Sequence, residues 1–352
     1  MRSRISFSSI RLMLTLFICA FAMLFMQSIF GEEKSDFITD LLSALFGLSI
    51  VLLCFVPSVI IKRKANLDFI SFVKLTTPSA VIFTSSYYAL YFAFLLTGFL
   101  IRYTDVFTKE LNPEANVYFV AVLMLAVCIY AASKGINNLS RAVIFIFALS
   151  FVAFFIITLG NIANLNFEIN KSNFSFNYNS VMQGVLFYSA IAFIAVIFGF
   201  TSLKAEKYKL KHTIITVITV FVAAAVLMFF IYFSLGKYAE RQPYEVYLLS
   251  KASHIGVVSG MDSLYLAVLT SSVFVLITAL LISMSNSVER KCRKKALLLF
   301  AVAVFILFIC AQNFNNVKDI LTDYYILNFL NFISAVIIPV IYIIVFRRRL
   351  NV

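Results

Sequence analysis

Residues 263–288, SLYLAVLTSSVFVLITALLISMSNSV, decide the class of this protein, because the whole stretch contains no charged side chain. A helix needs about 20 predominantly apolar residues to cross the hydrocarbon core of a bilayer. The apolar side chains form a continuous run rather than the strict alternation of a strand in a closed barrel. We therefore expect this stretch to be a membrane-spanning helix.

Runs of the same kind recur along the chain. Of its 352 residues, 62% are hydrophobic and only 13% are charged, against about 45–50% and about 25% in soluble domains. One water-soluble globule cannot bury that much apolar surface. We predict an all-α integral membrane protein with ten transmembrane helices, at residues 12–30, 37–61, 79–101, 116–133, 142–163, 181–203, 213–235, 263–288, 296–312 and 325–346.

The connections between these runs alternate in charge. The N-terminus, the segments 62–78, 134–141, 204–212 and 289–295, and the C-terminus together hold 21 of the 29 Lys and Arg residues but only 3 of the 16 acids. Basic connections stay on the cytoplasmic side of a membrane. Both termini are therefore predicted to be cytoplasmic, and 164–180 and 236–262 to face outward. The net charge of +13 is then a topology signal, and no nucleic-acid partner is expected.

The predicted number of helices suggests an internal repeat. Ten helices divide into five and five, and an odd half gives the second half the opposite orientation in the membrane. We predict one polytopic domain, 1–352, built from inverted repeats at about 12–163 and 181–346. In such proteins the first helix of each repeat is interrupted near the substrate, which places the interruptions near 20–22 and 189–192. The run 12–30 is interpreted as the first of these helices rather than as a cleaved signal peptide, because Ala20-Phe21-Ala22 lies in its middle.

Ionisable residues are nearly absent from the predicted spans. Asp40, Arg102 and Asp262 lie near span ends and are predicted to be interfacial, so that no buried carboxylate is expected for proton coupling. The chain has no HExxH, GxSxG, GxGxxG or Walker-type loop. We therefore do not expect an enzyme or a resident cofactor.

Four stretches resemble one known family in order and spacing. They are Arg4-Ile5-Ser6 with Ile10-Arg11-Leu12, the run Ser35–Gly47 that opens the second helix, the turn Lys134–Ala142, and Met261-Asp262-Ser263-Leu264. Together they resemble the spore germination permeases, the B subunits of nutrient germinant receptors, in the amino acid, polyamine and organocation permease superfamily. Phe37, Asn137 and Met261 stand where that family commonly has tryptophan, an acid and arginine.

The resemblance implies a multi-pass protein of the cell membrane or spore inner membrane. Such a protein binds a small nutrient, either with or without transporting it. It also implies a larger membrane subunit and a lipoprotein as partners, alongside membrane lipid. An uncharged amino acid is the expected ligand, because the predicted pocket holds no Arg or Lys and helix ends can bind a carboxylate. The candidate ligand-binding residues are small residues of the predicted spans 12–30 and 181–203 and two phenols of the span 79–101. They are Ala20, Ala22, Ser189, Ala190, Ala192, Tyr87 and Tyr91.

Two hydroxyls of the eighth helix, Thr270 and Ser271, are candidate ligands for a coupled sodium ion. For all of these small and hydroxylated residues the alternative is ordinary helix packing. The alternative function is another multi-pass protein, either a lipid-linked glycan flippase or a membrane acyltransferase. The first should show a charged cavity and the second a histidine at the membrane face.

Overall fold

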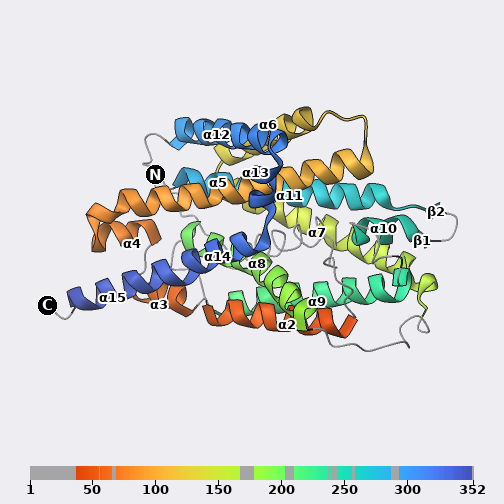
Figure 1. The fold of residues 1–352 in the computed structure, drawn as a ribbon, viewed down its shortest axis with the longest axis horizontal. Helices are drawn as coiled ribbons and strands as arrows, with labels where there is room; N and C mark the ends of the chain where they lie inside the picture. The colour runs from red at the N-terminus through yellow and green to blue at the C-terminus, as the bar shows by residue number, and fades with distance from the viewer. Residues whose placement is uncertain are drawn as a thin grey trace.

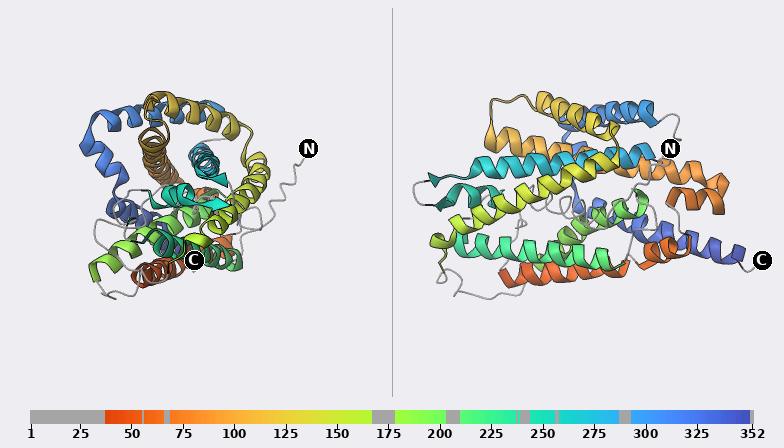
Figure 2. Two further views of the ribbon diagram at one scale, coloured as in Figure 1. Left: turned by 90° about the vertical axis from the view of Figure 1, so that its right-hand side faces the viewer. Right: turned by 180° about the vertical axis from the view of Figure 1, so that it is seen from behind.

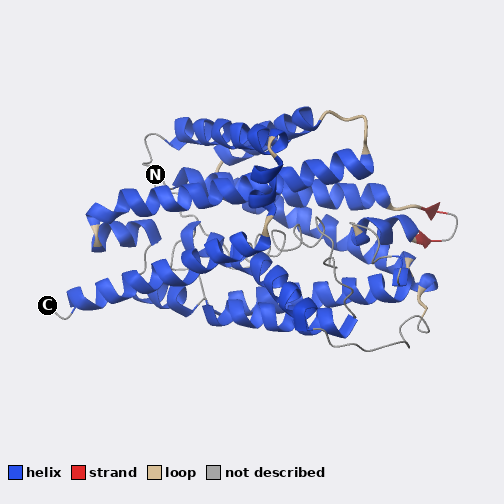
Figure 3. Cartoon of the chain, viewed as in Figure 1, coloured by secondary structure: helices blue, strands red, loops and turns tan. Residues whose placement is uncertain are grey.

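The computed structural model describes residues 37–54, 56–65, 69–166, 178–202, 210–236, 238, 244–255, 258–286 and 293–350. Helices form almost all of this part of the chain, with one short hairpin at one end (Figures 1 and 3). The elements are α2 (Phe37–Cys54), α3 (Val56–Ala65), α4 (Phe69–Thr76), η1 (Pro78–Ala80), α5 (Val81–Val106), η2 (Phe107–Leu111), α6 (Val117–Ser133), α7 (Ile136–Gly160), η3 (Ile162–Asn164), α8 (Tyr178–Ser202), α9 (Leu210–Phe230), η5 (Ile231–Leu235), α10 (Glu245–Ala252), β1 (His254–Ile255), β2 (Val258–Ser259), α11 (Asp262–Asn286), α12 (Arg293–Asn313), α13 (Asn315–Thr322), α14 (Tyr324–Phe332), η7 (Ile333–Ile337) and α15 (Ile338–Leu350).

Six helical segments of the described chain are long and apolar enough to cross a membrane: Phe37–Ser58, Pro78–Glu110, Ile136–Asn164, Asp262–Asn286, Lys295–Asn313 and Tyr324–Val345. Three shorter apolar helices, Val117–Ser133, Tyr178–Ile194 and Phe221–Leu235, match the other predicted spans from 37 onward. The predicted first span, 12–30, lies outside the described residues. The count of ten and the location of the termini therefore stay predictions.

The outer surface of the bundle carries large apolar side chains. Ile82 and Phe83 of α5, Phe145 of α7 and Leu53 of α2 are each more than 70% exposed. In water such a surface would drive association, whereas lipid chains solvate it without penalty. The helices therefore face lipid around the bundle.

Helix α11 forms the centre of one group of helices. Of its most apolar 18 residues, 72% are buried, against 28% for the most apolar 18 residues of 136–164 and of 295–313. It packs against α5, α6, α7 and α12, and an end-on view shows it among these helices (Figure 2). A helix that is apolar all round is expected to be buried in this way.

A second group consists of α2, α8 and α9, in which α2 packs along α8 and also contacts α9. The helices α2 and α8 approach so closely because each presents a glycine. A Cβ atom on Gly47 would lie 2.7 Å from the Val185 carbonyl oxygen, and one on Gly184 would lie 2.6 Å from the Ser43 Cβ. Small residues permit this backbone contact between membrane helices.

The C-terminal span is interrupted by a π-turn. In η7 the Ile338 N–H bonds the Ile333 carbonyl, which leaves the Ser334 carbonyl without its usual helical donor. Pro339 has no N–H to offer to Ala335. Both carbonyls find side-chain donors instead. The Tyr88 phenol donates to the Ser334 oxygen at 2.8 Å, and the Ser58 hydroxyl donates to the Ala335 oxygen at 3.3 Å.

Candidate functional site

A row of tyrosines on α5 faces the C-terminal span. Tyr87 and Tyr91 are four residues apart and so share one face of the helix, as predicted, with Tyr88 between them. The hydroxyls of Tyr87 and Ser334 are 3.0 Å apart, and the Tyr91 phenol donates to the Asn331 Oδ1 at 2.6 Å. Tyr88 and Tyr91 are buried, while Tyr87 is half-buried.

Two asparagines of α14 connect this row to α8. The Asn331 amide donates to the Ala190 carbonyl oxygen at 3.4 Å. One turn earlier, the Asn328 amide donates to the Leu186 carbonyl oxygen at 2.8 Å, and its Oδ1 accepts from the Ser189 hydroxyl at 3.0 Å. Polar side chains from α5, α8 and α14 thus meet in one cluster. We call this cluster the amide junction; its members are Tyr87, Tyr91, Ser189, Ala190, Asn328, Asn331 and Ser334.

Sequence reasoning missed the α14 members of the amide junction. A signal was present, because Asn328, Asn331 and Ser334 recur every third residue within an otherwise apolar run. Such spacing places polar groups along one face of a helix, and polar groups inside a membrane face the protein interior.

The predicted interruption of α8 is absent. The helix is continuous from Tyr178 to Ser202, through the predicted break at 189–192. Small side chains at Ser189, Ala190 and Ala192, all buried, let other elements approach α8 without a break in its backbone. In the described spans the departures from α-helical geometry lie elsewhere, at the π-helical segments η2, η5 and η7. Ala20 and Ala22 lie outside the described residues.

The candidate sodium ligands do not share a partner. The Thr270 hydroxyl lies 3.4 Å from the Tyr103 phenol of α5. The Ser271 hydroxyl instead donates to the carbonyls of Ala267 and Val268 in its own helix. Among the residues that the structure describes, no group of three or more His, Cys, Asp and Glu side chains could hold a metal ion.

The prediction that Asp40 is interfacial is wrong. Asp40 in α2 is 2% exposed, and its Oδ2 accepts from the Tyr232 phenol of η5 at 2.6 Å. A second carboxylate, Glu245 at the start of α10, is fully buried. Sequence reasoning placed Asp40 near a span end, where water is expected, but α2 packs against α8 and α9, and Tyr232 of η5 bonds the carboxylate.

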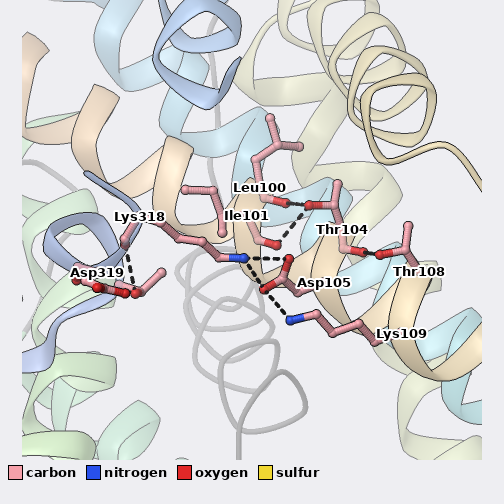
Figure 4. Close-up of polar contacts among 9 residues, drawn as sticks. Leu100, Ile101, Thr104, Asp105, Thr108, Lys109, Lys318 and Asp319 are labelled. Carbon is pink, nitrogen blue, oxygen red and sulfur yellow. Dashed lines mark hydrogen bonds and ion pairs between the residues drawn. The ribbon is translucent and has the colours of Figure 1, made fainter. Parts of the chain in front are cut away.

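Arg102 lies inside α5 rather than after it, because the helix continues to Val106. Its guanidinium donates to the Thr322 carbonyl at 2.5 Å and lies 4.7 Å from the centre of the Tyr324 ring. One turn on, Asp105 accepts from Lys318 of α13 at 2.8 Å and from Lys109 at 3.3 Å (Figure 4).

These contacts tie the end of α5 to the segment that leads into α14. Close by, burial and the carboxylates of Asp105 and Glu110 raise the pKa of Tyr244 to about 12, with Arg102 opposing the shift. The Tyr244 phenol therefore stays protonated to a higher pH than an ordinary tyrosine.

Comparison with known proteins places the chain in a family. The sequence model described as spore germination protein matches residues 4–319. No curated protein sequence matches.

Solved structures show the fold. The crystal structure of MhsT in complex with L-phenylalanine is similar with a TM-score of 0.62 and 16% identity, over 97% of this chain and 98% of that one. A substrate-bound, outward-open Na+-coupled sialic acid symporter is similar with a TM-score of 0.50 and 14% identity, over 88% and 75%. The fold is that of the LeuT-type transporters. Together the family and the fold indicate a multi-pass membrane transporter or receptor rather than an enzyme.

Proposed function

This chain belongs to the family of spore germination proteins, and from that premise we propose that it is the permease-like, nutrient-binding subunit of a germinant receptor. The proposed ligand is a small uncharged amino acid, held at the amide junction between α5, α8 and α14. In this proposal the chain binds the nutrient and conveys the event to its partner subunits, with or without transport.

The observation that carries this proposal is the convergence of neutral polar groups from three helices in the middle of the bundle. Phenol, amide and hydroxyl groups can each donate and accept hydrogen bonds. At 3.4 Å the bond from Asn331 to the Ala190 carbonyl is longer than ordinary N–H···O bonds. It is therefore the contact that a ligand carboxylate replaces most readily, by accepting from the freed amide.

The charge of the amide junction favours an uncharged ligand side chain. Its described members are Tyr, Asn, Ser and Ala, none of them ionised at neutral pH. A charged ligand side chain brought there would have no opposite charge to offset its loss of hydration. An amino acid with an apolar or small polar side chain meets no such cost.

The solved neighbours support the ligand class without deciding it. MhsT is described with L-phenylalanine, and the other neighbour is a Na+-coupled symporter. Sodium coupling in this chain stays a proposal, with Thr270 and Ser271 as its candidate ligands.

A binding measurement tests the proposed function. Ala190→Leu adds volume at a buried member of the amide junction, and leucine is tolerated in a membrane helix. We expect it to abolish binding of small L-amino acids to the purified full-length protein in lipid nanodiscs. Tyr91→Phe removes the phenol that orients Asn331 and should weaken binding about fivefold, the value of one neutral hydrogen bond.

Matched controls lie on the lipid face. Ala148→Leu and Tyr130→Phe make the same chemical changes at exposed positions of α7 and α6 and should bind like the parent. If Ala190→Leu and Tyr91→Phe also bind like the parent, the ligand does not occupy the amide junction.

The proposed partners are a larger membrane subunit and a lipoprotein. The short connections between helices leave little surface for a signalling output, so lipid-facing aromatic side chains are the proposed contacts. Co-purification of both subunits with this chain from spore inner membranes is the expected result. A complete germination response from this chain reconstituted alone would contradict the proposal.

A further inference from the structure

The C-terminal span is divided at η7 into two halves that have different neighbours. The half before the π-turn, α14, packs against α8, whereas the half after it, α15, packs against α3 and α4 (Figure 1). A π-turn and a proline are common causes of a bend in a helix, and Pro339 follows η7 closely. A change of the bend at η7 would therefore move the contacts of one half relative to those of the other.

Two backbone carbonyls at η7 depend on side chains of other helices. The Ser334 oxygen accepts from the Tyr88 phenol of α5 at 2.8 Å, and the Ala335 oxygen accepts from the Ser58 hydroxyl of α3 at 3.3 Å. Neighbouring helices commonly bond the carbonyls that a proline or a π-turn releases in a membrane span. Because these donors belong to α5 and α3, the backbone at η7 can bend when those helices shift.

The amide junction and η7 have one residue in common. The Ser334 hydroxyl donates to the Leu330 oxygen at 2.8 Å and lies 3.0 Å from the Tyr87 phenol, while its carbonyl is the one that Tyr88 bonds. Asn331, which bonds Tyr91 and α8, lies only three residues earlier. A rearrangement of the Asn331 amide is therefore felt directly at η7.

The Ser58 hydroxyl joins η7 to α3. Ser58 is 1% exposed, and Ile61 on the same helix is 3% exposed, so this face of α3 is buried where α3 packs against η7 and α15. The helix α3 also contains the beginning of the basic segment 62–78, which is predicted to be cytoplasmic. Movement at Ala335 would thus reach a segment outside the membrane core.

We propose that η7 is a hinge through which the amide junction controls the position of α3, and that the bond from Ser58 to Ala335 transmits the movement. A ligand carboxylate that takes the Asn331 amide from Ala190 frees α14 from α8, and the span then bends at η7. A ligand shifts such an equilibrium only by its different affinity for the two states, so the bent state is the one in which Asn331 bonds the ligand. This inference deepens the proposed function and rests on it for the nutrient.

The test needs no nutrient, because Asn331→Ala also removes the bond that holds α14 to Ala190. Spin labels are placed on Ile60→Cys of α3 and Leu90→Cys of α5, both exposed positions, after the five cysteines of the full-length protein are replaced by serine. Double electron–electron resonance in lipid nanodiscs measures the distance between the labels. Asn331→Ala should change it by about 2 Å or more, the size of a hinge rearrangement. Labels on Leu90→Cys and on Leu299→Cys of α12, which packs against α5, are the reference pair, and their distance should not change.

Ser58→Ala tests the transmitting contact. It removes the bond between α3 and η7, so adding Asn331→Ala to Ser58→Ala should produce no further shift of the α3 label. Ser49→Ala is the matched control, because the Ser49 hydroxyl donates to the Leu45 carbonyl of its own helix. In that background the shift caused by Asn331→Ala should persist. A purely structural role of Ser58 would lower stability without abolishing the shift.

Pro339→Ala tests the hinge itself. The substitution supplies an N–H that the Ala335 carbonyl can accept within its own span, which stiffens the helix at η7. The shift caused by Asn331→Ala should therefore disappear in the Pro339→Ala background. If Asn331→Ala fails to fold, Tyr91→Phe takes its place, since it removes the phenol that bonds Asn331.

Three results would overturn the hinge: no shift of the α3 label in Asn331→Ala or Tyr91→Phe, a shift that persists in Ser58→Ala or in Pro339→Ala, or an equal shift in the reference pair. The two proposals fail separately. Binding of small L-amino acids by the parent without any shift in the variants contradicts the hinge alone. The shift in a protein that binds no small L-amino acid contradicts the proposed function alone.

Discussion

Helices α2 and α8 are joined differently from helices α5 and α14. At the first contact two glycines let the backbones touch, with Gly47 against the Val185 carbonyl and Gly184 against the side chain of Ser43. At the second contact the helices are joined by phenols and amides, as in the bond between Tyr91 and Asn331. Both are ways to hold helices together in lipid, where no hydrophobic force acts between them.

The difference lies in how each contact responds to change. A glycine contact depends on the absence of atoms, so any added side chain disturbs it. A polar contact depends on the presence of partners, and it can exchange one partner for a ligand. This is the physical reason to place the proposed nutrient at the amide junction rather than between α2 and α8 at Gly47.

The largest expected effect is at the glycines. A Cβ at Gly47 meets a backbone oxygen at 2.7 Å, so Gly47→Ala should lower the free energy of unfolding by about 3 kcal/mol, because the backbones must separate. Gly184→Ala should destabilise similarly, but Ser43→Gly removes the atoms it meets and should partly restore stability. Unfolding of the purified variants in mixed detergent measures both. If Ser43→Gly gives no rescue, the close approach of α2 and α8 is not the cause.

The next effect is at the amide junction. Asn331→Ala leaves the buried Tyr91 phenol without its acceptor and should lower the free energy of unfolding by about 2 kcal/mol. Asn316→Ala, at an exposed position of α13, is the control and should change stability little. The same unfolding assay compares them, and equal stability of the two variants would show that water replaces the Asn331 amide.

Two buried tyrosines sharpen the comparison further, because one has a partner and the other does not. Tyr88 donates to the Ser334 carbonyl that the π-turn releases, so Tyr88→Phe should destabilise by about 1–2 kcal/mol. Tyr188→Phe removes a hydroxyl without a partner and should be neutral or stabilise by up to about 1 kcal/mol. Changes of the same sign and size in the two variants would contradict this difference.

The smallest effect is expected at the ion pair between Asp105 and Lys318. Both side chains are partly exposed, at 17% and 24%, so solvent screens their attraction. A double-mutant cycle with Asp105→Asn and Lys318→Met should give a coupling of about 0.5–1 kcal/mol that shrinks in high salt. Lys109, at 61% exposure, is the internal comparison, and its coupling to Asp105 should be close to zero.

Much of the fold could be predicted from the sequence because each membrane helix is determined by residues that are neighbours in the sequence. A helix satisfies its own backbone, so length and hydropathy alone predicted every span from 37–61 to 325–346 that the structure describes. The family could also be identified, from short stretches such as 134–142, and the family model confirms it. The shared face of Tyr87 and Tyr91 follows from helical geometry alone.

The sites could be predicted less well because they depend on which helices meet. The π-turn that lets Tyr88 bond Ser334 lies directly before Pro339, and no periodicity of the sequence indicates it. Asp40 has the sequence position of an interfacial acid, and only the tertiary contacts of α2, among them the bond from Tyr232 of η5, make it buried. The expectation of no buried carboxylate failed for that reason.

The sequence by itself determined that this protein is a helical membrane protein of the spore germination family, because hydropathy and short family stretches are properties of neighbouring residues. Only the tertiary structure decided that Asn331 faces Tyr91 and Ala190, and that Asp40 is buried against Tyr232 from a distant part of the chain. The physical reason is that a helix fixes which of its own residues share a face. The helix that each face meets is decided by close approach at residues such as Gly47 and by the pairing of buried polar groups.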